Sequence, residues 1–330
     1  MGDAATENAM KALILSLAIA NAAISGPAIA QPFPARPIQF VVPYPPGGTA
    51  EVIARVLAKK MGESLGTSII IENIGGASGT IGAANVARAA PDGYTLLFGY
   101  SPIFNAVPAL MPKLAYDPIK SFEPIGTVAQ FYQLTSAYHA APFSTVPDLI
   151  AYAKANPGKL TYGSPGVGST SNLMTELLKL KQGIDIVHVP YRGGGPAITD
   201  LIAGRLDVYT DAIGALLPRV EDKSIKPLAI TSARRLPALP HVPTYIELGM
   251  PELNVATWAA LFAPAGMPKA ITATLESELT KALNDGELRR IFADNYYEPV
   301  PDTPADVIAR TKAELSKWTN VVKDTGMKVE

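Results

Sequence analysis

The sequence predicts an α/β fold of two lobes, each built on a mostly parallel sheet with helices on its faces. Three observations lead to this prediction. Short apolar runs alternate with helical patterns along most of the chain, which is typical of parallel sheets covered by helices. The chain has 330 residues, enough for two domains of ordinary size. Its composition, 48% hydrophobic and 17% charged, supplies a large core.

The N-terminus has the features of a secretory signal peptide over residues 1–30. Lys11 precedes an apolar stretch, and small residues follow up to Ala30, where we expect cleavage. The residues before Met10 are acidic where a signal peptide carries positive charge, so either Met1 or Met10 could be the native start. The apolar run is shorter than the roughly 20 residues of a spanning helix. We therefore expect a soluble, exported protein.

The rest of the chain divides into strand-like and helix-like segments. The expected strands are Ile38–Tyr44, Ser68–Glu72, Tyr94–Tyr100, Lys159–Tyr162, Asp185–Pro190, Asp207–Thr210 and Lys226–Thr231. The expected helices between them are Ala50–Glu63, Val146–Ala155, Leu173–Lys181 and Ala197–Ala203. The last segment, Ala270–Lys323, is rich in helix formers and predicts two amphipathic helices with a break at residues 299–304.

The boundary between the lobes is placed where this pattern changes. The stretch Val128–Tyr138 follows one three-strand unit, and an expected return strand, Trp258–Pro264, brings the chain back. We therefore assign residues 31–130 and 251–330 to lobe 1 and residues 131–250 to lobe 2. Two lobes joined by two connections place a ligand cleft between them.

Charge, cysteine and histidine content exclude several kinds of site. The net charge is -1 and no basic block occurs, so the sequence lacks the features of a nucleic-acid binder. There is no cysteine, which excludes disulfides and thiolate metal sites. The three histidines, His139, His188 and His241, are not spaced as metal ligands. We predict no metal site and no cofactor.

Three glycine-rich loops are the most informative features. The first covers Pro45–Thr49, the second Ser164–Asn172 and the third Pro190–Ala197, and each lies between a predicted strand and a predicted helix. Ligands of open α/β sheets bind at this edge. A single loop of this kind would be a weak signal, since such clusters are common in ordinary turns. Three in equivalent places indicate a binding site.

The chemistry of these loops suits a small carboxylate better than a nucleotide. Neither GxxxxGK[ST] nor a GxGxxG after the first strand occurs. The loops offer backbone N–H groups and one guanidinium, that of Arg192, together with the hydroxyls of Ser169, Thr170 and Ser171.

An exported esterase-like enzyme is the alternative, and the residues favour it less. No GxSxG nucleophile motif is present. Ser164 would need a base, for which His188 is the candidate. We expect His188 to be a packed strand residue, and we predict no catalytic residue.

Aromatic side chains near the strand ends are candidates for the wall of the site. Tyr44, Tyr100 and Phe104 are assigned to it, together with Ser101, because ligand sites are mostly apolar with a few polar groups. Trp258 lies near a strand end too, but packing in the core explains it equally well.

The segments PDGYTLL, NPGKL and VPYRGGGPA occur in this order after the first loop. In them the chain resembles, over essentially its whole mature length, the extracytoplasmic solute receptors of tripartite tricarboxylate transporters, the Bordetella uptake gene (Bug) family. The resemblance implies a type II periplasmic-binding-protein fold, a periplasmic location, a small carboxylic acid bound between the lobes, and membrane transporter subunits as partners. A sensor role toward a membrane signalling partner, without transport, stays open. We expect a monomer.

The resemblance also implies the residues of the site. Main-chain N–H groups of the first loop grip the ligand carboxylate, directly and through waters, and the other two loops and the acid after the GRLDV strand complete the site. The residues assigned in this way are Pro46, Gly47, Gly48, Thr49, Ser164, Gly168, Ser169, Thr170, Asn172, Arg192, Gly193 and Asp211.

The chain departs from the family pattern at several positions. Glu51 stands where the family usually has Asp, and we expect it to pair with Arg55 one turn on. Asn172 stands where many members carry His. Phe104 and Val107 replace polar residues, which predicts a more apolar pocket. An aromatic or extended hydrophobic mono- or dicarboxylate is therefore the expected ligand, rather than citrate.

Overall fold

The structure, a computed structural model, has the alternating strands and helices of an α/β protein. It describes residues 33–46, 49–111, 113–300 and 302–326, so the predicted signal peptide lies outside the described residues. The strands are β1 (Ile38–Val42), β2 (Ile69–Asn73), β3 (Thr95–Tyr100), β4 (Phe122–Tyr138), β5 (Thr161–Ser164), β6 (Val187–Pro190), β7 (Val208–Ala212), β8 (Ile225–Ile230), β9 (Ala256–Pro264) and β10 (Tyr297–Glu298). The helices are α2 (Thr49–Leu65), α3 (Thr80–Ala87), α4 (Ser101–Phe104), α5 (Ala106–Leu110), α6 (Val146–Ala155), α7 (Thr170–Gln182), α8 (Gly194–Ile202), α9 (Ile213–Glu221), α10 (Lys269–Leu283), α11 (Gly286–Asp294) and α12 (Pro304–Thr325).

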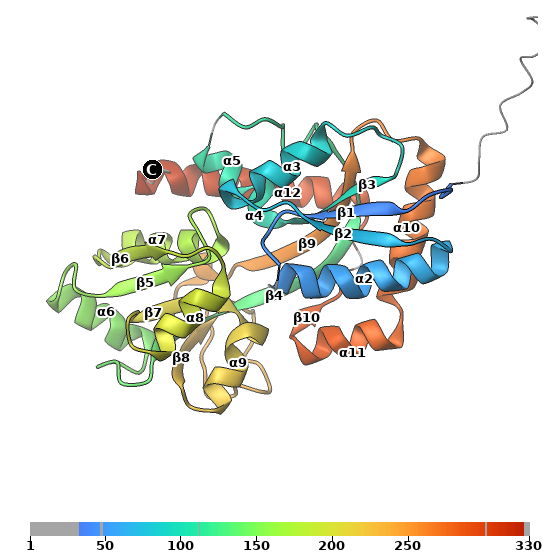
Figure 1. The fold of residues 1–330 in the computed structure, drawn as a ribbon. Coiled ribbons are helices and arrows are strands. Elements are labelled where there is room, and N and C mark those ends of the chain that lie inside the picture. Colours follow the sequence, from blue (N-terminus) through green and yellow to red (C-terminus); the bar gives the residue numbers. More distant parts are fainter. Residues whose placement is uncertain (1–32, 47–48, 112, 301, 327–330) are drawn as a thin grey trace, which may run out of the picture. The chain divides into compact units, whose positions relative to one another are not determined.

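The long strand β4 takes part in two groups of strands. Its residues Phe122–Tyr132 pair with β9, and β9 continues to β3, β1 and β2; we call this group, with β10, sheet A. Its residues Gln133–Tyr138 pair with β7 and β8, and β7 continues to β5 and β6; we call this group sheet B. Figure 1 shows β4 running from one group into the other.

The strand directions bring the functional ends of both sheets to the middle of β4. β1 and β3 are parallel to each other. Since β3 and β4 are both antiparallel to β9, the strands β1, β3 and β4 all run in the same direction, toward sheet B. β5, β6 and β7 are mutually parallel and run against β4, toward sheet A. The carboxyl ends of the two sets of strands therefore meet at the boundary between the sheets.

The sequence of β1 and α2 explains how the core of sheet A forms. In β1 only Gln39 is exposed, as expected for a parallel strand that is covered on both faces. In α2 the side chains of Ile53, Leu57 and Met61 are completely buried. Their spacing of four residues forms one apolar stripe along the helix, which holds α2 against the sheet.

Most predicted strands and helices are present, but β4 was not predicted as a strand. The sequence suggested only a lobe boundary at Val128–Tyr138, whereas the strand has 17 residues. Pro124 and Gly126 lie inside it, and the register shifts between them. Because proline and glycine are usually depleted in strands, the apolar alternation of β4 is hidden in the sequence.

The C-terminal segment also differs from the prediction. It contains three helices, α10, α11 and α12, and the short strand β10, where two helices and no strand were expected. The additional helix begins at Asp285, whose carboxylate accepts hydrogen bonds from the backbone N–H groups of Glu287 and Leu288. The predicted break was correct, since α12 starts after it with a capping box between Thr303 and Asp306.

Helix α12 contributes to two different parts of the core. Near its start, Val307 packs in a cluster with Phe104 and Trp258 of sheet A. Near its end, Trp318, which is 3% exposed, packs in a cluster with Leu177 and other residues of the sheet B helices. One helix therefore links the apolar cores on the two sides of the boundary.

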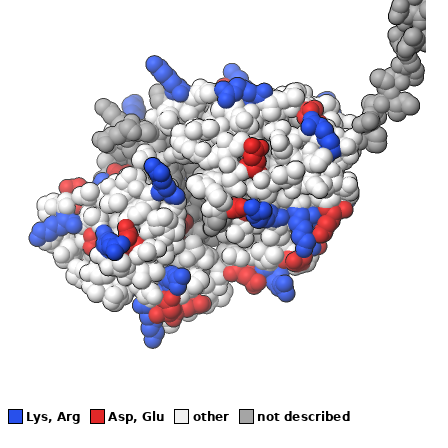
Figure 2. Space-filling model, in the orientation of Figure 1, with Lys and Arg blue, Asp and Glu red and all other residues white. Residues whose placement is uncertain are grey.

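The whole segment from Arg36 onward forms one compact unit. The exact division into residues 31–130 plus 251–330 and residues 131–250 therefore stays a prediction, although β4 changes sheets after Tyr132. Acidic and basic side chains are interspersed on the face drawn in Figure 2. Within the part of the chain that the structure describes, no helix combines the length and the apolar character needed to cross a bilayer.

The link through α12 predicts a large stability loss for Trp318→Ala. Removing a fully buried tryptophan leaves a cavity and should lower the free energy of unfolding by about 3–5 kcal/mol. Urea denaturation followed by circular dichroism measures this change. The matched control is Lys312→Ala on the same helix, whose side chain is exposed and whose loss should cost less than about 0.5 kcal/mol. Equal losses for the two variants would contradict the assigned role of Trp318.

Candidate functional site

The three glycine loops all lie at the boundary between the sheets. The first follows β1 and precedes α2, the second joins β5 to α7, and the third joins β6 to α8. This is the placement that the sequence predicted, at the carboxyl ends of strands and the amino ends of helices. The strand ends of β3 and β7 add Tyr100 and Asp211 to the same boundary.

The first loop is held at its start by the neighbouring strand. The side-chain amide of Asn73 donates a hydrogen bond to the backbone carbonyl of Tyr44 over 3.1 Å. Pro46 is exposed. Gly47 and Gly48 lie outside the described residues, as does the side chain of Thr49, so their assignment to the ligand stays a prediction.

Glu51 does not face the boundary as a free carboxylate, because it pairs within its own helix. The guanidinium of Arg55 donates to the Glu51 carboxylate, with Nε 2.8 Å from Oε1. The prediction that Glu51 pairs with Arg55 is therefore confirmed. The pair reduces the repulsion that this acid would exert on an anion at the start of α2.

An aromatic cluster lies where β1 and β3 end. The ring of Tyr100 is 5.4 Å from that of Tyr44, 5.8 Å from that of Phe98 and 5.5 Å from that of Phe131, measured between centroids. The Tyr100 hydroxyl is buried, and no residue that the structure describes forms a hydrogen bond with it. A buried polar atom of this kind is uncommon in proteins and marks a place that a ligand or water can satisfy.

Asp211 brings a half-buried acid from sheet B to the same boundary. Its carboxylate accepts hydrogen bonds from the Tyr209 hydroxyl at 2.6 Å and from the Ala212 N–H at 2.8 Å. Burial raises the pKa of Asp211 above its ordinary value, although both hydrogen bonds act in the opposite direction. Burial also raises the pKa of Tyr100, with Asp211 among the charges that add to the effect, so the two groups interact across the boundary.

The third loop leaves room for this carboxylate. A Cβ added to Gly194 would lie 2.5 Å from Oδ2 of Asp211, so only glycine lets α8 begin against the acid. Gly193 has a φ of 117°, a value that favours glycine. Arg192 is exposed, and within the described ranges it has neither a hydrogen bond nor an ion pair. Its contact with a ligand stays a prediction.

The second loop is held by polar contacts of its own side chains. Oδ1 of Asn172 accepts from the Gly168 N–H at 3.0 Å, and Nδ2 donates to the Tyr162 hydroxyl at 2.8 Å. Ser169 caps α7, and its hydroxyl also donates to the Gly166 carbonyl at 2.7 Å. Asn172 thus fixes the conformation of the loop through both ends of its side-chain amide.

Ser164 and His188 lie next to each other, although the sequence favoured a structural role for His188 over a catalytic one. The Ser164 Oγ is 2.7 Å from Nε2 of His188, and the histidine ring stacks on Tyr162 with centroids 4.7 Å apart. Ser164 is completely buried, and its hydroxyl also bonds with Gly166. Burial lowers the pKa of His188. His188 is a packed strand residue as expected, with the additional role of fixing Ser164.

Phe104 lies in the core rather than at the rim of a pocket. It is completely buried, and its ring stacks on Phe262 at 4.2 Å and on Trp258 at 6.0 Å. Its neighbour Ser101 is buried, and its hydroxyl accepts a hydrogen bond from the backbone N–H of Trp258 at 3.4 Å. The sequence suggested that Phe104 lies at a pocket rim, and the structure does not support this placement. The rings of Phe104, Phe122, Trp258 and Phe262 pack against one another there.

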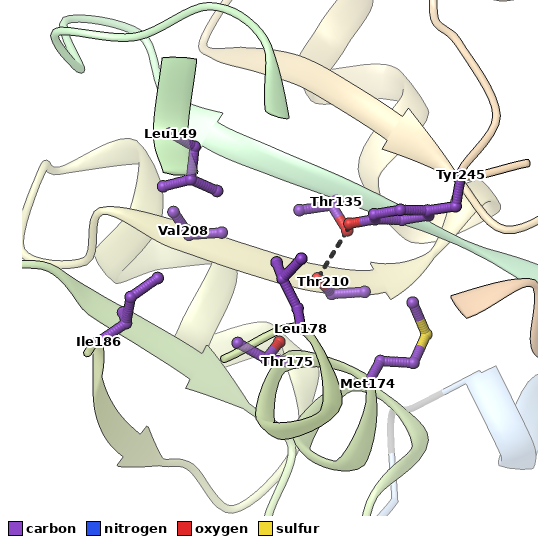
Figure 3. Close-up of a pocket in the computed structure, with 9 residues that line it drawn as sticks. All are labelled: Thr135, Leu149, Met174, Thr175, Leu178, Ile186, Val208, Thr210 and Tyr245. Carbon is purple, nitrogen blue, oxygen red and sulfur yellow. Dashed lines mark hydrogen bonds between the residues drawn. The ribbon is translucent and has the colours of Figure 1, made fainter. Parts of the chain in front are cut away.

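A small cavity lies inside the sheet B half and is too small for a carboxylic acid. Its volume of about 10 Å³ is room for about one water molecule. The Thr135 hydroxyl is hydrogen bonded to that of Thr210 at 3.0 Å, which Figure 3 marks with a dashed line, and to that of Tyr245 at 2.7 Å. The lining residues are Thr135, Leu149, Met174, Thr175, Leu178, Ile186, Val208, Thr210 and Tyr245.

Two direct hydrogen bonds across the boundary were not foreseen from the sequence. The Ser78 hydroxyl donates to the Val167 carbonyl at 2.7 Å, and the Thr257 hydroxyl donates to that of Thr170 at 2.9 Å. The partners are 89 and 87 residues apart in the chain. The serine in the segment IGGASG was the available signal for the first of them.

Comparison with known proteins agrees with this architecture. Residues 53–327 match the family model described as the tripartite tricarboxylate transporter family receptor. The protein BugT of Bordetella pertussis is 36% identical over 318 residues, which cover 96% of this chain and 98% of BugT. An R. palustris protein with adipate has a TM-score of 0.84 and 35% identity, covering 90% of this chain and 99% of that one. MatC from Rhodopseudomonas palustris with bound malate has a TM-score of 0.82 and 34% identity, covering 88% of this chain and 100% of MatC. The matches confirm the predicted α/β periplasmic-binding-protein fold.

The raised pKa of this acid predicts that Asp211→Asn stabilises the protein at neutral pH. A carboxyl whose pKa is raised on folding destabilises the folded state above that pKa, and the effect disappears as the pH falls through the folded pKa to the ordinary value near 3.8. We expect the variant to melt a few degrees higher at pH 7, with a difference that shrinks below the folded pKa. Differential scanning calorimetry across this pH range measures it. The control is Asp294→Asn, an exposed acid on α11; a variant of Asp211 no more stable than this control would refute the prediction.

Proposed function

This chain belongs to the tripartite tricarboxylate transporter receptor family, and on this basis we propose that it captures a small carboxylate in the periplasm and delivers it to transporter subunits of that type. The two lobes close around the ligand at the boundary between the sheets. The family consists of solute receptors rather than enzymes, so the prediction that the chain is not an enzyme is confirmed.

Relatives support a carboxylate as the ligand class. Two of the matched structures hold adipate and malate, which are both dicarboxylates. The glycine loops of this chain supply the groups that such an anion needs, since backbone N–H groups at helix starts favour negative charge. We therefore place the carboxylate of the ligand at the first and second glycine loops.

The observation that carries the finer proposal is the Tyr100 hydroxyl, which has no hydrogen-bond partner among the described residues. It belongs to a cluster with Tyr44 and Phe131, so a ligand that reaches it passes along aromatic rings. A ligand with an aromatic or extended hydrophobic body fits this wall. The preference now depends on Tyr44 and Tyr100, since Phe104 lies in the core.

Asp211 gives the ligand a direction. A carboxylate that is partly shielded from water repels a second anion more strongly than an exposed one does. The charged groups of the ligand therefore lie away from Asp211, and its uncharged body lies toward it. This orientation disfavours citrate, which carries three carboxylates.

The proposal of an aromatic or extended carboxylate is tested by a calorimetric screen of the wild-type protein. We expect binding of adipate, suberate or terephthalate, with weaker or no binding of citrate. The dimethyl esters of the same acids keep the body and remove the charge, and they should not bind. Binding of citrate without binding of the longer or aromatic acids would refute the finer proposal, and no binding of any carboxylate would refute the ligand class.

The role of the Tyr100 hydroxyl is tested by Tyr100→Phe. The variant keeps the ring and removes one hydrogen bond to the ligand, so the dissociation constant of the best acid in the screen should rise about 3- to 10-fold. The control Tyr152→Phe removes a hydroxyl from α6, in the apolar cluster of the sheet B half. Unchanged affinity in Tyr100→Phe would remove this hydroxyl from the site.

The same protein preparation tests the sensor role that the sequence left open. Capture of a membrane signalling protein in place of transporter subunits would support the sensor alternative.

A further inference from the structure

The turn between β2 and α3 touches both of the glycine loops that are assigned to the ligand carboxylate. A Cβ added to Gly75 would lie 3.2 Å from the backbone nitrogen of Pro45 in the first loop. A Cβ added to Gly79 would lie 3.4 Å from the carbonyl of Pro43. On its other side the turn reaches the second loop through the Ser78 hydroxyl, which donates to the Val167 carbonyl at 2.7 Å. The turn therefore bridges sheet A and sheet B.

The backbone of this turn is unusual for residues that carry side chains. Four successive residues have positive φ values: Gly76 at 126°, Ala77 at 45°, Ser78 at 56° and Gly79 at 90°. Glycine adopts such angles without strain, whereas a residue with a Cβ does not. Positions 77 and 78 thus hold two residues in a strained conformation between Gly76 and Gly79. At position 78 a specific hydrogen bond of the side chain can compensate for this strain, and the Ser78 hydroxyl forms one across the boundary.

The second loop accepts the Ser78 hydrogen bond, and beside this bond it also packs against another element, α5. Val167 lies between Gly166 and Gly168, which have φ values of 137° and 81°. A Cβ added to Gly168 would lie 3.2 Å from the side chain of Val107 on α5. The loop is thus enclosed by the Ser78 turn and by α5. Its neighbour Thr170 receives the second crossing hydrogen bond, from Thr257.

We propose that Ser78 is a positioning residue for ligand capture: its hydroxyl holds the second glycine loop against the sheet A half in the closed form of the protein. Ser78 then acts through Val167 and needs no contact with the ligand. The inference rests on the proposed function, since closure around a carboxylate is what the bond would stabilise. One neutral hydrogen bond shifts such an equilibrium by about 3- to 10-fold.

The experiment measures closure directly. The chain has no cysteine, so Glu63→Cys on α2 and Lys181→Cys on α7, both exposed, give one unique pair of spin-label sites across the boundary. Double electron–electron resonance then records the distance distribution with and without adipate as the probe. Three variants are compared in this background: Ser78→Ala, Ser78→Gly and Thr80→Val.

The three variants distinguish the effect of the Ser78 hydroxyl from the effect of backbone strain and from that of another hydroxyl in the same turn. Ser78→Ala removes the hydroxyl and keeps the strain, whereas Ser78→Gly removes both. Thr80→Val removes a hydroxyl of the same turn that bonds only to Ala77, at 2.9 Å, and it is the matched control. We expect both Ser78 variants to lose the shorter-distance population about 3- to 10-fold, and Thr80→Val to keep it.

Three outcomes would overturn the inference. Distributions that are equal in all four proteins would mean that the bond does not hold the closed form. A change in Ser78→Ala that is absent in Ser78→Gly would assign the effect to strain. A wild type without the shorter distance, either alone or with adipate, would mean that the crossing bond does not form. If adipate leaves every distribution unchanged while the Ser78 variants still differ from wild type, adipate is not a ligand of this protein and the role of Ser78 stands.

Discussion

Every candidate group reaches the site because β4 is shared between the two sheets. Its first part extends sheet A and its second part extends sheet B, and the neighbouring strands of the two sheets run toward each other along it. A loop at the carboxyl end of β1 and a loop at the carboxyl end of β5 are therefore brought together, although more than 100 residues separate them in the chain. If β4 ended at Tyr132, the same loops would lie on unrelated surfaces.

Much of this could be read from the sequence, and the reasons are local. Helix α6 was predicted with its observed ends, and in the structure Thr145 caps its first turn and Pro147 lies just inside it. The three glycine loops were predicted in the right order because strand, turn and helix signals occur in succession. The family was identified from short segments, and the matched relatives confirm it.

What the sequence could not supply depends on contacts between distant residues. Phe104 looked like a pocket residue because it follows a strand end, but the rings of Phe122 and Phe262 enclose it. Nothing in the segment SPIF encodes that enclosure. Asn172 looked like a ligand donor, and its amide is occupied by Gly168 and Tyr162 instead. Ser78 was not predicted as a functional residue, since its hydrogen-bond partner Val167 lies 89 residues away in the chain.

The two tryptophans of the chain lie in different parts of the core. Trp258 packs with the aromatic rings of sheet A, and Trp318 packs among the helices of sheet B. Replacing either one by phenylalanine leaves a single indole whose emission reports on one side of the boundary. Intrinsic fluorescence can therefore follow the two halves of the protein separately as it unfolds, with no dye attached.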